Sequence, residues 1–266
     1  MASLYERLKE CLETEQPVAV ATVVRGERLL GQKMLVFPDG RTEGTLGDPA
    51  LEGPVVASAR RLLDEGRSAT LPFDLPGPAG QPETVEVFIE SYLPAPTLFI
   101  IGAVHTAIAL THIAKLLGFR VKVIDARGKF ATRERFPHAD ELIVAWPDEV
   151  LQRERLDRST YIVILTHDPK FDEPSLRVAL QSNARYIGAI GSRKTSQDRL
   201  ARLRQQGFSE EQLRRIHAPI GLPIGARTPE EIALAIAAEM IAVKNGRTLV
   251  AVETPPVEAT APAAGG

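Results

Sequence analysis

The stretch TLFIIGAVHTAIALTHIAKLLGFRVKVIDAR, residues 97–127, restricts the possible folds more than any other part of the chain. An apolar run ends at Gly102, a helical pattern follows, and a second apolar run ends at Asp125. This order is the outline of a dinucleotide-binding unit, whose turn usually carries three glycines. Here Val104 and Ala107 occupy the second and third glycine positions. The sequence therefore predicts the unit but leaves open whether it binds a dinucleotide, another ligand or none.

Apolar runs and helical patterns alternate from residue 97 to residue 246. The runs are short, rich in β-branched residues and apolar on both faces, as strands covered by helices on both sides must be. The strands we expect are Leu98–Ile101, Val121–Asp125, Glu141–Ala145, Tyr161–Thr166 and Tyr186–Ile190. Such an alternation predicts an α/β domain with a doubly wound, parallel, Rossmann-like sheet over residues 97–246.

Residues 1–94 predict a smaller N-terminal α+β domain. It begins with an amphipathic helix, and PVAVATVVRG, KMLVFPDG and TVEVFIESY are typical of strands. LEGPVVASARRLLDEG predicts a helix that ends at Gly66. TLPFDLPGPAGQPE holds four prolines and two glycines, so we expect a surface loop there. Pro94 and Pro96 mark the boundary between the two domains.

The last helix is predicted from its ends. Thr228 is its expected N-cap, Pro229 its first residue and Glu231 the partner in a capping box, while Gly246 ends it. The proline- and alanine-rich residues 247–266 are expected to be disordered.

Composition excludes several classes of protein. With 44% apolar and 25% charged residues and a formal net charge of −2, the chain has no concentrated basic face for nucleic acid. No apolar run reaches the roughly 18 residues needed to span a bilayer, and the charged N-terminus lacks a signal-peptide core. A single cysteine, Cys11, allows no intrachain disulfide, and its helical spacing from Leu4 and Leu8 indicates a core position. We therefore expect a cytoplasmic protein.

Polar groups follow four of the predicted strands, and ligands of open parallel sheets bind beyond the carboxyl ends of the strands. The four groups should therefore converge on one edge, as a cofactor-binding site. Its expected residues are Gly102, His105, Asp125, Arg127, Thr166, His167, Asp168, Gly191, Ser192, Arg193 and Lys194.

Residue types suggest what these groups can bind. The amides that follow Gly102 can receive an anion, and Arg193 and Lys194 suit a phosphate, although a Ser192 cap with solvated charges would look the same. Asp125 is spaced to hold a ribose hydroxyl, or serves as a turn residue. His167 could contact a ligand, exchange protons or touch a metal.

Two kinds of site are not indicated. No His/Cys set has the spacing of a structural zinc site. No serine lies in a nucleophile elbow, and no tyrosine–lysine pair resembles that of a short-chain dehydrogenase. We therefore assign neither a metal ligand nor a catalytic residue.

Long motifs resemble those of the XdhC/CoxI family, accessory proteins of molybdenum hydroxylases such as xanthine dehydrogenase. They are GAVHTA, RERFPHAD, THDPKFD, YIGAIGSRK and HAPIGLPIGARTPEEIALAIAAE, with a looser match of EGTLGDPALE in the N-terminal zone. The chain departs from the family at Val104, at Pro223 where relatives often have aspartate, and in LGDPALEG, which keeps Glu52 but lacks the cysteine common there.

The resemblance implies a chaperone that binds molybdenum cofactor and delivers it to an apo-hydroxylase, with sulfur supplied by a partner cysteine desulfurase. It implies a carrier more than an enzyme, with cofactor bound between the N-terminal domain and the sheet edge; a homodimer is possible. Two rivals use the same edge. One is an NAD(P)-dependent oxidoreductase, and the other is a nucleotide-sensing binding module.

Overall fold

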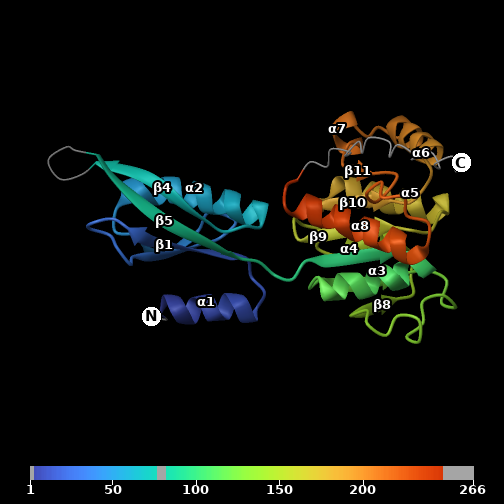
Figure 1. The fold of residues 1–266 in the computed structure, drawn as a ribbon, viewed down its shortest axis with the longest axis horizontal. Coiled ribbons are helices and arrows are strands. Elements are labelled where there is room, and N and C mark those ends of the chain that lie inside the picture. Colours follow the sequence, from blue (N-terminus) through green and yellow to red (C-terminus); the bar gives the residue numbers. More distant parts are fainter. Residues whose placement is uncertain (1–2, 77–81, 248–266) are drawn as a thin grey trace, which may run out of the picture.

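The computed structural model describes residues 3–76 and 82–247, which form two sheets with separate cores (Figure 1). The expected disordered tail lies, from residue 248 on, outside the described residues. Within the described part of the chain, no helix has the length and apolar character needed to cross a membrane.

The N-terminal sheet is antiparallel, with strand order β3-β2-β1-β5-β4. Its strands are β1 Val18–Arg25, β2 Lys33–Val36, β3 Thr42–Thr45, β4 Ala69–Pro76 and β5 Pro82–Tyr92. Helix α1, Leu4–Glu13, packs on one face, where Cys11 is buried as expected, and α2, Pro49–Glu65, packs on the other (Figure 1). Gly66 ends α2 in the left-handed conformation, with φ +70°, as predicted.

The loop predicted over TLPFDLPGPAGQPE is wrong for its first half, because β4 covers Ala69–Pro76. This strand lies at the edge of the sheet and pairs only with β5 among the described strands. An edge strand tolerates Pro72 and Pro76, since one row of its backbone groups needs no partner. The prediction is also wrong for the last two residues of the segment, Pro82 and Glu83, which begin β5, while residues 77–81 lie outside the described residues.

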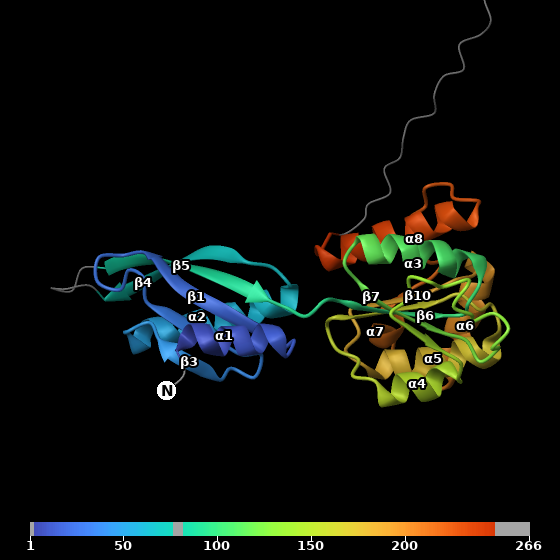
Figure 2. The same cartoon turned by 90° about the horizontal axis from the view of Figure 1, so that it is seen from below.

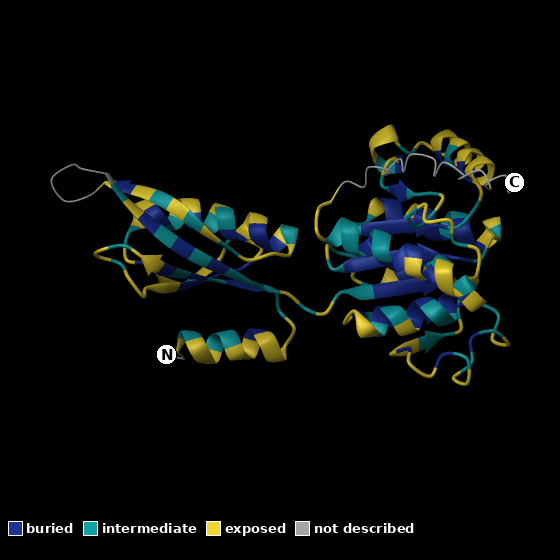
Figure 3. Ribbon diagram, in the orientation of Figure 1, coloured by how far each residue is buried: buried dark blue, intermediate teal, exposed yellow. Residues whose placement is uncertain are grey.

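The C-terminal sheet is parallel and six-stranded, with order β11-β10-β9-β6-β7-β8. Its strands are β6 Thr97–Ile101, β7 Arg120–Ile124, β8 Glu141–Ile143, β9 Thr160–Ile164, β10 Tyr186–Ala189 and β11 Ile216–His217. The first five coincide with the predicted strands to within two residues at each end. The strands at the middle of the sheet are buried on both sides (Figure 3).

Helices cover both faces of the parallel sheet (Figure 2). One face carries α3 His105–Leu116 and α8 Pro229–Lys244. The other face carries α4 Pro147–Arg153, α5 Pro169–Gln181, α6 Arg193–Gln205 and the short α7 Glu210–Leu213. Each fully buried Leu, Ile, Val or Phe in these two layers contributes about 1.5–3 kcal/mol of transfer free energy. The predicted fold class, a doubly wound parallel sheet with a smaller α+β unit, is confirmed.

The start of α8 is also as predicted. Thr228 is the N-cap, its hydroxyl accepts from the Glu231 N–H at 3.2 Å, and the Glu231 carboxylate closes the capping box. The helix ends at Lys244, and Gly246 follows with φ +61°.

The N-terminal unit lies beyond the amino ends of the parallel strands (Figure 1). There the Arg185 guanidinium donates to the carbonyls of Asp64 at 2.6 Å and Glu65 at 3.2 Å, and Arg120 pairs with Glu15 at 2.6 Å. The expected cleft between the N-terminal domain and the carboxyl edge of the sheet is therefore wrong. The N-terminal unit and the carboxyl edge lie at opposite ends of the parallel strands, because β6 leaves the linker and runs away from the N-terminal unit (Figure 1).

Candidate functional site

The carboxyl edge of the parallel sheet is formed by the loops that follow β6, β7, β9 and β10, which are adjacent in the order β10-β9-β6-β7. All eleven predicted site residues lie in these loops or in the first turns of the helices that follow. The N-termini of α3, α4, α5 and α6 open at the same edge, and their free N–H groups favour anions.

Gly102 allows close contact between the loop after β6 and the loop after β9. It has φ +101°, and a Cβ there would lie 2.7 Å from Thr166 Cγ2 and 3.1 Å from the Thr166 N. Only glycine allows this approach. Val104 is the N-cap of α3 and has no capping side chain, so no partner satisfies the N–H groups of His105 and Thr106 within the described residues.

Asp125 holds the turn after β7. Its carboxylate accepts from the Ala103 N–H at 2.9 Å, from the Arg127 N–H at 2.9 Å and from the Arg127 guanidinium at 2.8 Å. Burial raises the pKa of Asp125, but the hydrogen bonds from Arg127 and Ala103 outweigh burial and lower it. Both oxygens are engaged, which fits a turn residue and leaves the ribose role that the spacing suggested without a free acceptor.

A buried ion pair lies behind the loop after β9. Arg199 of α6 donates to Asp172 of α5 at 3.0 Å and to the Ile190 carbonyl at 3.0 Å, and the Thr166 hydroxyl donates to the other Asp172 oxygen. Burial raises the pKa of Asp172, opposed by the hydrogen bond from Thr166 and by the charge of Arg199. Sequence reasoning missed Asp172 and Arg199, although THDPKFD contains the first.

His167 and Asp168 complete this loop. His167 is exposed and has φ +58°, a conformation that costs a non-glycine residue roughly 1–3 kcal/mol. Asp168 is the N-cap of α5 and accepts from the Lys170 N–H at 3.1 Å. The turn therefore leaves His167 exposed at the carboxyl edge of the sheet.

The GSRK segment opens α6. Ser192 is the N-cap and accepts from the Thr195 N–H at 3.1 Å, as the capping interpretation predicted. Arg193 and Lys194 are exposed, and neither makes an ion pair within the part of the chain that the structure describes. Both cations are available to a ligand.

Two buried polar atoms near Gly191 have no hydrogen-bond partner in the described chain. They are Ser196 Oγ and Arg199 Nη1, in residues that are each only 3% exposed. A Cβ on Gly191 would lie 3.7 Å from Ser196 Oγ, so these atoms border the same loop. An unpaired buried donor costs about 1–3 kcal/mol, which favours a bound polar group at this place.

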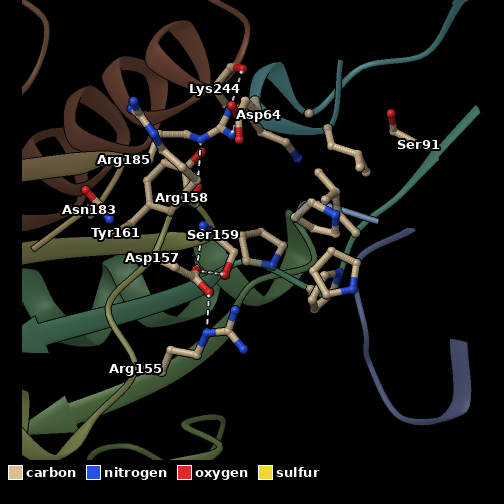
Figure 4. A pocket seen from close by; sticks show the side chains of 18 residues that line it. Asp64, Ser91, Arg155, Asp157, Arg158, Ser159, Tyr161, Asn183, Arg185 and Lys244 are labelled. Carbon is tan, nitrogen blue, oxygen red and sulfur yellow. Dashed lines mark hydrogen bonds and ion pairs between the residues drawn. The ribbon is translucent and has the colours of Figure 1, made fainter. Parts of the chain in front are cut away.

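Among residues 3–76 and 82–247 no cluster of three or more His, Cys, Asp or Glu side chains could hold a metal. A cavity of about 450 Å³ lies at the amino edge, between the two units (Figure 4). Its lining includes four cations, two carboxylates and several prolines; the charged residues are Arg155, Arg158, Arg185, Lys244, Asp64 and Asp157. Glu52, in the N-terminal unit, accepts a hydrogen bond from the Leu46 N–H at 2.9 Å and thereby stabilises the turn between β3 and α2.

A parallel sheet with helices on both faces and helix N-termini at its carboxyl edge defines a Rossmann-type protein. The chain belongs to the XdhC and CoxI family. The family model described as the XdhC Rossmann domain matches residues 98–240, more than half of the chain, and the model described as the XdhC and CoxI family matches residues 11–74. The family expected from the motifs is confirmed.

Curated relatives carry related names. The chain is 32% identical over 244 residues, 88% of its length, to 44% of the "Uncharacterized protein YqeB" of Escherichia coli (strain K12). It is 32% identical over 159 residues, 60% of the chain, to 46% of a Bacillus subtilis (strain 168) protein named as a probable xanthine dehydrogenase subunit. It is 34% identical over 90 residues, 34% of the chain, to 28% of the E. coli "Molybdenum cofactor insertion chaperone PaoD". The chain thus spans less than half the length of each.

A solved structure shares the fold. The crystal structure described as a xanthine dehydrogenase from Bacillus halodurans matches 96% of this chain and 98% of its own, with a TM-score of 0.53 and 24% identity. At this identity the likeness concerns the architecture alone.

Proposed function

We propose that the protein is a cytoplasmic accessory factor that binds molybdenum cofactor at the carboxyl edge and delivers it to a molybdenum hydroxylase apoenzyme. The names of two relatives support this choice of cofactor and of a molybdenum hydroxylase as the protein that receives it. The observation that carries the site is the convergence, on one edge, of free helix N–H groups, two unpaired cations and two unsatisfied buried polar atoms.

The residues present suit molybdopterin, which has a phosphate and a polar bicyclic ring. Arg193 and Lys194 would bind the phosphate, with Ser192 holding the helix N-terminus in place. The turn at Gly102 would let the ligand approach the main chain. His167 would contact the pterin or exchange protons with it.

Sulfur would have to come from a partner, such as a cysteine desulfurase. The chain's single cysteine, Cys11, lies on α1 and is fully buried against the N-terminal sheet, and burial raises the pKa of its thiol. A buried, protonated thiol is a poor nucleophile. The chain thus has no thiol suited to carry sulfur at the carboxyl edge.

The test measures retention of molybdopterin by the purified protein under anaerobic conditions. The variant Arg193→Ala/Lys194→Ala should bind at least tenfold more weakly, since each charge-assisted hydrogen bond contributes about 1.5–3 kcal/mol. The matched control is Arg214→Ala, which removes an exposed arginine after α7. No retention by the wild type, or equal retention by all three proteins, would contradict the proposal.

The nucleotide rivals are tested in parallel with NAD(P)H and adenine nucleotides. Selective nucleotide binding with turnover would favour the oxidoreductase, and binding without turnover would favour the sensing module. The engaged carboxylate of Asp125 weighs against both in their usual pose.

A further inference from the structure

Trp146, the only tryptophan of the chain, is 46% exposed at the carboxyl edge. It follows β8 and is the N-cap of α4. Its ring packs at 5.1 Å, tilted by 48°, on the ring of Phe171, which is only 4% exposed at the start of α5. The indole is thus fixed on one side by a core residue, and its other side is open. Val144, two residues earlier, is 56% exposed and enlarges the apolar surface.

Cations lie over the neighbouring aromatic rings. The Arg127 guanidinium is 4.6 Å from the centre of the Phe130 ring and 5.8 Å from that of Phe171. Lys129 lies 5.0 Å from the Phe130 ring, and Lys170 lies 4.8 Å from the Phe171 ring. We call Phe130, Trp146 and Phe171, together with Arg127, the aromatic ledge.

Arg127 is held rigidly. Its Nε and Nη2 donate to the two oxygens of Asp125 at 2.9 and 2.8 Å, which fixes the planar guanidinium in one orientation, and the side chain is partly exposed. Of the two lysines, Lys170 lies 3.5 Å from Asp168, while Lys129 makes no ion pair within the described residues. The ledge therefore combines flat surfaces with three cations, of which Arg127 and Lys170 are paired with carboxylates and Lys129 is not, while Asp148 and Glu149 follow Trp146 in the first turn of α4.

Fixed aromatic and guanidinium planes suit one kind of ligand. Planar heterocycles stack on them, and nearby cations favour those that carry a phosphate. The ledge lies beyond the ends of β7, β8 and β9, beside the loops that hold Gly102 and His167. An exposed apolar surface at such a strand edge is typical of a ligand-binding site.

We infer that the aromatic ledge binds the ring of a planar, phosphorylated nitrogen heterocycle, stacked on Trp146 and Arg127. This inference rests on the proposed function when the heterocycle is a pterin. The other source of the same chemistry is the base of a nucleotide. In both cases Trp146 contacts the ring, and the phosphate lies toward the N-termini of the helices that open at this edge.

The experiment titrates the full chain with molybdopterin, AMP, CMP and inorganic phosphate, using calorimetry and the fluorescence of Trp146. The wild type should show quenching by a ring-bearing ligand and none by phosphate. Trp146→Ala should weaken binding of that ligand about five- to a hundredfold and leave phosphate binding unchanged, while Trp146→Phe should retain most of the affinity. The control is Leu234→Ala, since Leu234 is 54% exposed on α8, which covers the other face of the sheet.

The outcomes separate the two proposals. Loss of molybdopterin affinity in Trp146→Ala, with an unchanged far-ultraviolet spectrum, supports both. Loss of AMP or CMP affinity, without any molybdopterin binding, supports the ledge and overturns the proposed function. Molybdopterin binding that is equal in wild type and Trp146→Ala, without quenching, overturns the ledge alone. Binding of no ring-bearing ligand overturns both.

Discussion

Gly102 shows how much of the candidate site depends on one residue. Gly102→Ala places a methyl group against the Thr166 backbone and side chain while the residue has φ +101°. We expect the free energy of unfolding to fall by about 2–4 kcal/mol, from backbone strain and overpacking together. Urea denaturation measures the loss.

Gly118 provides the control for this prediction. It also has a positive φ, +80°, but a Cβ there meets nothing within 4 Å. Gly118→Ala should therefore cost only the backbone term, about 1–2 kcal/mol. Equal losses in the two variants would mean that the loops after β6 and β9 are not in contact.

At this scale the sequence predicted positions better than contacts. Spacing alone placed Gly102 and Asp125 at adjacent strand ends. The Asp172–Arg199 pair could not be predicted, because its partners are 27 residues apart, on different helices, and meet only after both helices pack on the sheet. The hydrogen bonds from Arg127 to Asp125 could not be predicted either, because an aspartate that stabilises a turn and an aspartate that binds a ribose occupy the same position in a sequence.

At the scale of elements, Glu239 attaches α8 to the end of the sheet. Its carboxylate accepts from the Tyr186 hydroxyl and from the Gly221 N–H at 2.9 Å, and it lies 3.3 Å from His217 Nδ1. Burial raises the pKa of Glu239, but the hydrogen bonds from His217, Tyr186 and Gly221 outweigh burial and lower it. A lowered folded-state pKa adds stability above the ordinary glutamate pKa, and that stability is lost as the pH falls through the folded-state value.

Glu239→Gln should therefore lower the free energy of unfolding at pH 7 by about 1–3 kcal/mol, the worth of hydrogen bonds to a charged group. The difference from the wild type should shrink as the pH falls below the ordinary glutamate pKa of about 4.3 and disappear once the pH passes the lowered folded-state pKa of Glu239, where the wild-type carboxylate also becomes neutral. Urea denaturation at a series of pH values measures it. Glu230→Gln, an exposed position in the first turn of the same helix, is the control, and a difference that does not change with pH would contradict the prediction.

The elements also show where sequence patterns fail. Strands β6, β9 and β10 were predictable because they are covered on both sides and must be apolar throughout. Strand β4 was not, because its prolines indicate a loop unless the strand is known to lie at an edge. Strand β11 has two residues, too few for any periodic pattern.

At the scale of the whole molecule, Arg185 links the two units. It donates to the last turn of α2, at the carbonyls of Asp64 and Glu65, and also to the carbonyls of Arg158 at 2.7 Å and Lys244 at 3.5 Å (Figure 4). The partial negative charges at the ends of two helices, α2 and α8, therefore meet one guanidinium.

Arg185→Ala should loosen the arrangement of the two units without unfolding either, because their hydrophobic cores share no residue. Small-angle X-ray scattering should show a larger radius of gyration and a broader range of interdomain distances. Arg155→Ala is the control, since Arg155 lines the same cavity but, among the residues that the structure describes, forms an ion pair only with Asp157. A scattering curve identical to that of the wild type would mean that the linker and the Arg120–Glu15 pair alone set the arrangement.

The position of the N-terminal unit behind the strands has a consequence for transfer. On the proposed function, an incoming client meets the loaded edge directly, and no hinge has to move before contact. Handover would then be a competition between two proteins for the same small molecule, and its rate should rise with client concentration until the encounter complex is saturated.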